Sequence, residues 1–350
     1  MLNASILTEA IEKIRQEHNI VGMSVAVTDR QGTVYKAGFG CQSTLQPKIA
    51  THPDAMYKIA SMTKTVTAVV VLRLCQDGVL DLDTPVKYYL PGFTLSCPKA
   101  VETMTLRHLL THTSGLYADD WLEEGTHDET CMNGAICAVV PVLPMVGLPG
   151  EGKYCYSNWG YNIIAWVVTS VTGKGLTELY QEYVLRPMGM ERTTFDYQAA
   201  SSYLLSMPHT CDANGKSCQD SHQRINMAYA GGAGLYSNAE DMCKWARFLL
   251  RDGVTDDGLR LLSPESVIEF YHKHTPKTDA PGSFYGLGLF ISPFKDRFIY
   301  GHTGNYDPYN SSIFVDKKTG VGVVTLYNTN NIRETDPRYM IPEMIFSMMG

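Results

Sequence analysis

The sequence lacks the short patterns that mark several large enzyme classes. None of its nine cysteines forms a C-x-x-C pair, and no G-x-S-x-G, H-E-x-x-H, Walker or dinucleotide-binding pattern occurs. The α/β-hydrolase, zinc-peptidase and nucleotide-dependent classes therefore have no support, and neither a metal nor a cofactor is expected. An odd number of cysteines without such a pair favours reduced, buried thiols over a disulfide framework or a zinc site, with Cys131/Cys137 and Cys211/Cys218 as the remaining possible pairs.

Concentrated positive charge and long apolar runs are absent as well. The 350 residues include 29 lysines and arginines against 36 aspartates and glutamates, a net charge of −7, and the basic residues form no run. Nucleic acid and anionic membrane are therefore not expected as partners. The N-terminus shows no basic segment followed by an apolar one, and no apolar stretch approaches a membrane span, so we expect a cytoplasmic protein. Nothing in the sequence indicates an oligomeric state.

The chain does carry clear helix and strand signals. Hydrophobic residues make up 44% of the chain and charged residues 19%, which is typical of a soluble globular protein. Isoleucines at helical spacing predict a helix over roughly residues 5–18, and alternating apolar residues predict a β-hairpin over 23–39. Four strands followed by a C-terminal helix are expected near the other end; the strands are Tyr285–Ile291, Phe298–Tyr300, Ser311–Val315 and Val321–Tyr327.

The order of these signals indicates the domain organisation. Strand signals lie near both chain ends, whereas helical and loop-rich segments fill the middle. We therefore expect an α+β protein in which one antiparallel sheet is assembled from both ends and flanked by helices. Residues 1–80 and 226–350 would form this discontinuous sheet domain, and residues 81–225 would form an inserted, mainly helical domain.

One stretch places a nucleophile beside a basic side chain. Ser61-Met62-Thr63-Lys64 opens an apolar helix that ends near residue 77, and residues three apart on a helix share a face. The Ser61 hydroxyl and the Lys64 amine can therefore touch. Two other Ser-x-x-Lys copies, at Ser96 and Ser292, have proline inside the spacing, which disfavours a continuing helix. The position at a helix start, rather than the pattern alone, selects Ser61.

Two further patterns combine with this pair. Tyr156-Ser157-Asn158 follows a glycine-containing turn, and His302-Thr303-Gly304 directly follows the strand expected at 298–300. Together the three elements resemble the penicillin-recognising serine hydrolases. Wider stretches are similar to the branch that contains class C β-lactamases, D-stereospecific peptidases and family VIII esterases; they are residues 109–115, 186–194 and 231–235. The resemblance runs from about Gly22 to Tyr327 and implies a β-lactamase/transpeptidase-like fold.

The resemblance implies a role for each motif residue. Ser61 would be the nucleophile that forms an acyl-enzyme. Lys64 would activate Ser61 and Tyr156 would protonate the leaving group, acting jointly, and which of the two carries the serine proton stays open. The backbone N–H groups of Ser61 and Asn305 would stabilise the oxyanion. Asn158 would hold Lys64 or the acyl amide through its side chain.

The third motif departs from the pattern of many β-lactamases. His302, predicted here to be catalytic, stands where many of them carry lysine, and in this respect the chain resembles D-peptidases and some esterases. A histidine can be neutral at pH 7, so the motif does not imply carboxylate recognition or antibiotic hydrolysis. Thr303, Gly304, Asn305 and Tyr306 are expected to bind the substrate, with the tyrosines near residue 306 shaping the acyl pocket.

Three functions are compatible with these residues. The first is hydrolysis of a small-molecule ester or amide, as an esterase, a D-amino-acid peptidase or a β-lactamase-like enzyme. The second is a transacylase that passes the acyl group to an alcohol or amine, because the same intermediate serves both reactions. The third is a non-catalytic binding or sensor protein, which the joint presence of Ser61, Lys64 and Tyr156 disfavours.

Other polar and aromatic residues have a structural interpretation. His112, within Thr111-His112-Thr113-Ser114, is expected to support a turn rather than to catalyse. The tryptophans Trp159, Trp166 and Trp245 are expected in the core. The acidic residues between Asp119 and Glu129 are expected to form a solvated loop, with recognition of a cationic substrate as the less favoured alternative.

Overall fold

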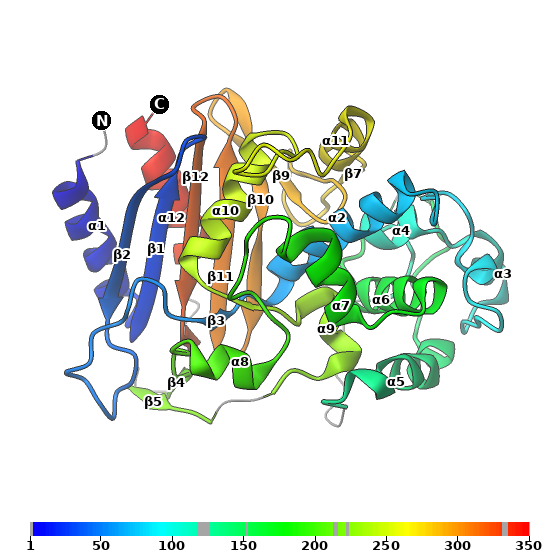
Figure 1. Cartoon of the computed structure of the whole chain (residues 1–350), viewed down its shortest axis with the longest axis horizontal. Helices are drawn as coiled ribbons and strands as arrows, with labels where there is room; N and C mark the ends of the chain where they lie inside the picture. Colours follow the sequence, from blue (N-terminus) through cyan, green and yellow to red (C-terminus); the bar gives the residue numbers. More distant parts are fainter. Residues whose placement is uncertain are drawn as a thin grey trace.

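An eight-stranded sheet forms the centre of the protein. The computed structural model (Figure 1) describes residues 3–117, 126–151, 153–212, 216–221, 224–330 and 335–349. The strand order is β2-β1-β12-β11-β10-β9-β8-β7, and every neighbouring pair is antiparallel. This confirms the α+β fold with a sheet built from both chain ends. The strands are β1 (Gly22–Thr28), β2 (Thr33–Gly40), β7 (Thr275–Pro276), β8 (Phe284–Tyr285), β9 (Phe290–Phe294), β10 (Arg297–Tyr306), β11 (Tyr309–Asp316) and β12 (Val321–Tyr327).

Helices cover both faces of this sheet because successive strand residues point to opposite faces. Ala26 and Val324 belong to one buried cluster, whereas their neighbours Val25 and Val323 belong to another. Helix α10 (Ala239–Leu250) packs on the first face, and α1 (Ala4–Glu17) and α12 (Pro337–Met349) pack on the second (Figure 1). The predicted N-terminal helix, hairpin and C-terminal helix are all present.

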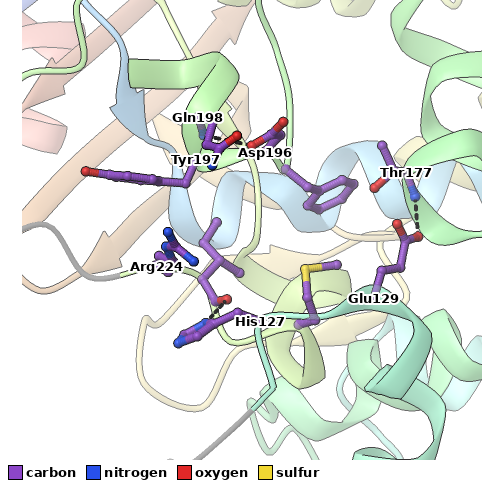
Figure 2. Close-up of a pocket in the computed structure, with 10 residues that line it drawn as sticks. His127, Glu129, Thr177, Asp196, Tyr197, Gln198 and Arg224 are labelled. Carbon is purple, nitrogen blue, oxygen red and sulfur yellow. Dashed lines mark hydrogen bonds between the residues drawn. The ribbon is translucent and has the colours of Figure 1, made fainter. Parts of the chain in front are cut away.

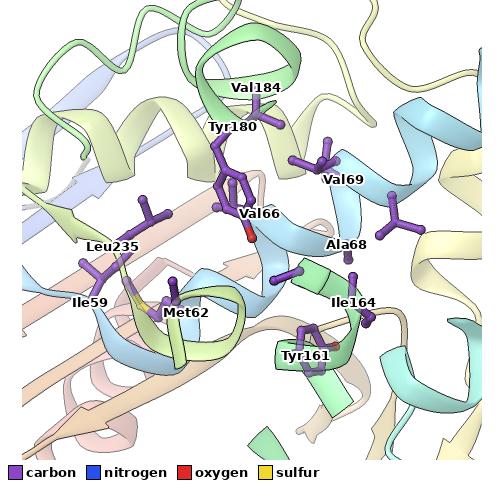
Figure 3. Close-up of a cluster of buried hydrophobic side chains, with 14 of the residues drawn as sticks. Ile59, Met62, Val66, Ala68, Val69, Tyr161, Ile164, Tyr180, Val184 and Leu235 are labelled. Carbon is purple, nitrogen blue, oxygen red and sulfur yellow. The ribbon is translucent and has the colours of Figure 1, made fainter. Parts of the chain in front are cut away.

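The buried cluster on the first face continues around α2 (Thr63–Gln76), the helix that follows the single turn η1 (Ala60–Met62). Eleven of its fourteen residues are buried, because it packs against helices on several sides. Figure 3 shows Val66 of α2 beside Tyr180 and Ala68 of α2 beside Ile164. The remaining helices are α3 (Pro98–Thr103), α4 (Leu106–Leu110), α5 (Met132–Val139), α6 (Asn158–Thr172), α7 (Leu176–Tyr180), α8 (Tyr197–Ser202), α9 (Ala230–Ala233) and α11 (Pro264–Tyr271), and the short strands are β3 (Tyr57–Lys58), β4 (His209–Cys211), β5 (Ser217–Gln219), β6 (Tyr236–Ser237) and β13 (Thr329–Asn330).

Capping residues set several helix ends. The side chains of Thr105, Asn238 and Ser263 accept backbone N–H groups at the starts of α4, α10 and α11. Gly173 ends α6 with φ +69°, a left-handed conformation that glycine adopts without strain. These local signals fix where the helices around the site begin and end.

Two strand predictions near the site are wrong in extent. The stretch Tyr285–Ile291 is not one strand, because β8 ends at Tyr285 and β9 begins only at Phe290. Gly288 in the intervening loop has φ +77°, and a Cβ there would lie 2.6 Å from the Lys64 carbonyl oxygen, so this loop packs directly on α2. The strand expected at 298–300 continues to Tyr306, so the third motif lies inside β10 rather than after it.

The division into a sheet domain and an inserted domain at residues 81–225 stays a prediction. Helices α3 to α8 fall within this segment, and so do β4 and β5, which form a separate three-stranded sheet with β13. Helix α6 of this segment packs against α2 and α9, which lie outside it. The active-site motifs therefore come from both sides of the predicted boundary.

The tryptophans lie in or against the core as expected, whereas the expectation of buried thiols is wrong for most cysteines, since only Cys243 is buried. All nine cysteines are free thiols, including those of the possible pairs 131/137 and 211/218. Trp159 and Trp245 are buried, and the half-buried Trp166 packs against Phe93 with ring centres 6.3 Å apart. Within the described ranges, we find no helix with the length and apolar character that a membrane span needs.

Candidate active site

The predicted nucleophile lies in η1, directly before α2. The turn is unusual because Ala60 adopts φ +49°, a conformation that non-glycine residues rarely take. Neighbouring elements hold it from two sides: the Ile59 N–H donates to the Leu235 carbonyl at 2.9 Å, and the Ile59 carbonyl accepts from Ser311 Oγ at 2.8 Å. The half-buried Ser61 is therefore presented by a turn that the surrounding fold keeps in place.

Lys64 is fully buried and contacts the nucleophile. Its Nζ lies 3.0 Å from Ser61 Oγ, 2.5 Å from Asn158 Oδ1 and 3.0 Å from the Gly232 carbonyl oxygen. The amide and carbonyl oxygens can only accept hydrogen bonds, so they take two of the nitrogen's hydrogens. The remaining tetrahedral position of Nζ points toward Ser61 Oγ. An ammonium has a third hydrogen there and donates it, whereas a neutral amine has its lone pair there and can accept the serine hydrogen.

Tyr156 brings the second motif to the same place. Lys64 Nζ lies 4.9 Å from the centre of the Tyr156 ring, and that ring lies 6.2 Å from the His302 ring. Residues from all three motifs, which are widely separated along the chain, therefore meet around the Lys64 amine. The catalytic roles of Ser61, Lys64, Tyr156 and His302 stay predictions.

His112 packs against the second motif and hydrogen-bonds to its backbone. It is buried with φ +58°, and its Nδ1 accepts the Ser157 N–H at 3.1 Å. Its ring packs against that of Tyr156, with centres 4.2 Å apart and the planes tilted by 35°. Burial, reinforced by the charge of Lys64, holds the pKa of His112 well below its usual range. A neutral imidazole that accepts through Nδ1 carries its hydrogen on Nε2. These contacts agree with a scaffolding role for His112.

His302 is also a neutral, buried imidazole. Its Nδ1 contacts the Thr303 carbonyl oxygen, which can only accept, so Nδ1 carries the hydrogen and Nε2 accepts from the Tyr285 hydroxyl at 3.0 Å. Its ring stacks on Phe290 with centres 4.2 Å apart. Burial and the nearby Lys64 charge hold the pKa of His302 well below its usual range. The side chain therefore supplies no cation at the position where many β-lactamases carry lysine.

In its second half, β10 still pairs with β11 along one edge, but its other edge lies next to η1 instead of β9. Its pairing with β9 ends at Gly301, whereas its pairing with β11 continues to Tyr306. A Cβ at Gly304 would lie 2.2 Å from the Ile59 carbonyl oxygen, so only glycine allows this close approach. Thr303 and Tyr306 are half-buried and Asn305 is exposed beside the turn that carries the nucleophile. The four predicted substrate-binding residues of β10 thus line the side of the site.

Sequence reasoning missed three residues that support the site. The Gly232 carbonyl holds Lys64, the Tyr285 hydroxyl holds His302, and the Arg338 guanidinium donates to the Gly304 carbonyl at 3.1 Å while pairing with Asp336 at 2.7 Å. The glycine lies in a stretch that resembles the family, but its carbonyl carries no side-chain signal. No local sequence pattern identifies Tyr285 or Arg338 as residues that support the site.

Acidic residues near the site form no metal centre in the described ranges, where no group of three or more suitable ligands occurs. Most of the predicted acidic loop, Asp119, Asp120, Glu123 and Glu124, lies outside the described residues. Glu129, the last acidic residue of this loop, accepts the Thr177 N–H at 2.7 Å. Glu129 is thus bound to the backbone rather than open to a ligand.

A pocket of about 260 Å³ opens where residues 224–227 lead toward α9 (Figure 2). Tyr197 and Arg224 lie on its wall, with the guanidinium 5.8 Å from the tyrosine ring centre. Asp196, also on the wall, accepts the Gln198 N–H at 2.7 Å. The pocket therefore combines an aromatic face with one arginine and with carboxylates that cap local backbone.

Comparisons with known proteins agree with this geometry. Protein flp of Staphylococcus aureus (strain MW2) is 26% identical over 323 residues, which cover 92% of this chain but only 62% of that protein. The octameric penicillin-binding protein homologue from Pyrococcus abyssi superposes with a TM-score of 0.85 at 24% identity, covering 99% of this chain and 77% of that one. EstCE1, a hydrolase with promiscuous acyltransferase activity, superposes with a TM-score of 0.80 at 19% identity, covering 99% and 98%.

The two solved structures establish the shared fold, and the sequence comparison decides the family. The family model described as Beta-lactamase matches residues 7–341 of the 350. This range contains all three motifs and every strand of the sheet. The chain therefore belongs to the Beta-lactamase family.

Proposed function

We propose that this protein is a serine hydrolase that cleaves a small-molecule ester or amide through an acyl-enzyme on Ser61. One observation carries the proposal: the buried Lys64 amine contacts Ser61 while two oxygens that can only accept fix its other hydrogens. Such an amine points a lone pair at the hydroxyl when it is neutral, which is the arrangement a general base needs. Membership of the Beta-lactamase family supports the serine-hydrolase class.

Acylation follows from these positions. Ser61 Oγ attacks the acyl carbon while its proton passes to Lys64 Nζ. The leaving alcohol or amine takes a proton from the Tyr156 hydroxyl, which Lys64 then reprotonates. The negative charge on the carbonyl oxygen is stabilised by the backbone N–H groups of Ser61 and Asn305. Asn158 and Gly232 hold the amine in place throughout.

Deacylation reverses these transfers with water. A water molecule gives a proton to the Lys64–Tyr156 pair and attacks the acyl carbon, and Ser61 Oγ leaves and recovers its proton. An alcohol or amine in place of water gives acyl transfer. EstCE1, whose fold this chain shares, is a hydrolase with promiscuous acyltransferase activity, so transacylation is the second candidate.

The test uses 4-nitrophenyl esters of increasing acyl length. We expect nitrophenol release and an acyl adduct on the Ser61 peptide, observed by mass spectrometry. In Ser61→Ala, we expect adduct and turnover to be lost, with a fall of at least about 10³-fold in kcat/KM. Ser292→Ala is the matched control because Ser292 lies in another Ser-x-x-Lys pattern and outside the proposed site. Unchanged turnover in Ser61→Ala would refute the proposal.

The acceptor is tested in the same assay. With added primary alcohol or amine, a transacylase yields acylated acceptor in preference to free acid, whereas a hydrolase yields free acid at all modest acceptor concentrations. Product analysis by chromatography distinguishes the two. Both outcomes require the Ser61 adduct, so this measurement separates acceptor choice from the identity of the nucleophile.

A further inference from the structure

Three cationic side chains are buried in the described part of the chain, and one of them differs from the other two. Lys64 lies within hydrogen-bond distance of Ser61, Asn158 and Gly232, and Arg247 pairs with Asp256 at 2.6 Å. Lys58 is 2% exposed, yet no described carboxylate, amide or carbonyl pairs with its ammonium. An unpaired buried cation is costly, so a lysine at this position needs a partner that the folded chain does not supply.

The surroundings of Lys58 are aromatic. Its Nζ lies 3.9 Å from the ring centre of Tyr306 and 6.0 Å from that of Tyr236, which is its partner on β6. Ring faces attract a cation but leave its remaining hydrogens without acceptors. The Nζ atom is also not sealed from solvent, unlike the unpartnered Nε2 of His112. A ligand group can therefore reach the nitrogen.

The position of Lys58 relative to Ser61 indicates which part of a substrate it meets. Tyr156 lies near His302, at one end of the site-facing half of β10, whereas Lys58 lies against Tyr306 at the other end. Tyr306 lies four positions after His302 on the strand, which places the two residues roughly 13 Å apart. The leaving group is protonated at the Tyr156 end. The acyl part of the substrate therefore extends along β10 toward Lys58.

We infer that Lys58, with the ring faces of Tyr306 and Tyr236, forms a subsite for a carboxylate carried by the acyl part of the substrate. This inference rests on the proposed acyl-enzyme at Ser61 and names its substrate class: an ester or amide of a dicarboxylic acid, with one carboxylate free. The carboxylate supplies the acceptors that Lys58 lacks, and its binding offsets the cost of the buried charge. Lys58 is a specificity-determining residue and takes no part in bond making.

The charge of Lys58 makes this selectivity depend on pH. Burial lowers the pKa of Lys58 to about 7. The groups that face it are Tyr306 from β10 and Tyr236 from β6. Tyr309 on β11, Asp196 and Arg224 interact electrostatically with Tyr236. Burial raises the pKa values of the three tyrosines, which stay neutral, so the lysine changes charge near pH 7. Selectivity for an anionic acyl group should therefore fall as pH rises through about 7.

The experiment compares two substrates that differ only in charge. Mono-4-nitrophenyl adipate carries a free carboxylate, and its methyl ester masks the same group. The measured quantity is the ratio of kcat/KM for the acid to kcat/KM for the methyl ester, corrected for spontaneous hydrolysis. In the unmodified protein we expect this ratio to fall about tenfold or more between pH 6 and 8.5. At pH 6, Lys58→Met should lower it at least about tenfold, whereas Lys58→Arg should keep it high at both pH values.

Controls separate this inference from the proposed function. Lys13→Met removes an exposed lysine on α1, remote from Ser61, and should leave the ratio and its pH dependence unchanged. A Ser61 adduct with an equal ratio in Lys58→Met and the unmodified protein would overturn the inference and leave the hydrolase intact. Absence of a Ser61 adduct with either ester would overturn both. If Lys58→Met does not fold, a ratio independent of pH in the unmodified protein overturns the inference by itself.

Discussion

The two lysines that flank the nucleophile lie in opposite kinds of surroundings. Lys64, on the α2 and α6 side, is held by a side-chain amide and a backbone carbonyl. Lys58, on the β3 and β10 side, faces two tyrosine rings and no described acceptor. Both side chains are buried to nearly the same extent, at 0% and 2% exposed. Burial alone therefore does not define a role, and the hydrogen-bond partners distinguish an amine held for chemistry from one open to a ligand.

The difference in hydrogen-bond partners between Lys64 and Lys58 also indicates what each side of the site contributes. On the Lys64 side, oxygen atoms of the protein hold the amine, so its position is set before substrate arrives. On the Lys58 side the protein leaves a charge without an acceptor, which favours a substrate that supplies one. Substitutions at the two lysines should therefore differ in kind as well as in size.

The largest expected effect is at Lys64. We expect Lys64→Met to lower kcat/KM for the methyl adipate ester at least about 10³-fold, because Ser61 loses the group that takes its proton. Stopped assays with the Ser61 adduct as readout would show slow or absent acylation. Lys13→Met controls for loss of an unrelated lysine. A loss of equal size in Lys58→Met with this uncharged substrate would break the comparison between the two lysines.

A smaller loss of activity is expected on removing the Asn158 amide, which holds the Lys64 amine. Asn158→Ala leaves Lys64 in place but removes one of its two fixed acceptors, so we expect a fall of about 10- to 100-fold in kcat with KM changed less. Asn133→Ala is a matched control, since its side chain accepts from Thr169 at 3.0 Å on α6. An unchanged kcat in Asn158→Ala would show that the Asn158 amide is not needed to orient Lys64.

The smallest expected effect is the change in the free energy of unfolding caused by Lys58→Met. Lysine titrates near pH 10.4 in an unfolded chain but near 7 in this fold, so between these values the unfolded chain binds more protons and stability rises with pH. Below pH 7 the folded protein carries the full cost of the buried cation. We expect Lys58→Met to raise the free energy of unfolding by about 1–3 kcal/mol at pH 6, with a smaller gain at pH 9.5.

Urea unfolding of both proteins at the two pH values measures this difference. Lys13→Met should show no such pH dependence, because its ammonium is exposed. An equal gain at pH 6 and 9.5, or a loss at pH 6, would contradict the assignment of Lys58 as an unpaired buried cation.

Sequence reasoning reached the parts of the site that depend on local spacing. Ser61 and Lys64 are one helical turn apart, so their contact follows from the chain itself, and the family resemblance located Tyr156 and His302. The length of β10 did not follow, because residues 302–306 become strand only through pairing with β11. The break at Gly288 was missed for the same reason: it depends on contact with α2, more than 200 residues earlier.

Lys58 shows most clearly what cannot be predicted from the sequence. In the sequence it is one lysine among many, and lysines are usually exposed. Its burial depends on Tyr306 and Tyr236, both far along the chain, and its lack of an acceptor depends on everything packed around it. Unpaired charge is a property of the folded arrangement, so no periodicity or motif can reveal it.

The anchoring of η1 by late segments has a consequence for biosynthesis. The Ser311 hydroxyl that holds Ile59 lies 252 residues downstream, and Leu235 lies far downstream as well. A nascent polypeptide therefore leaves the ribosome with its nucleophile long before the turn around it is secured. A ribosome-stalled fragment ending at residue 300 should give no Ser61 adduct, whereas release of the whole chain should give one, so synthesis itself delays the onset of reactivity.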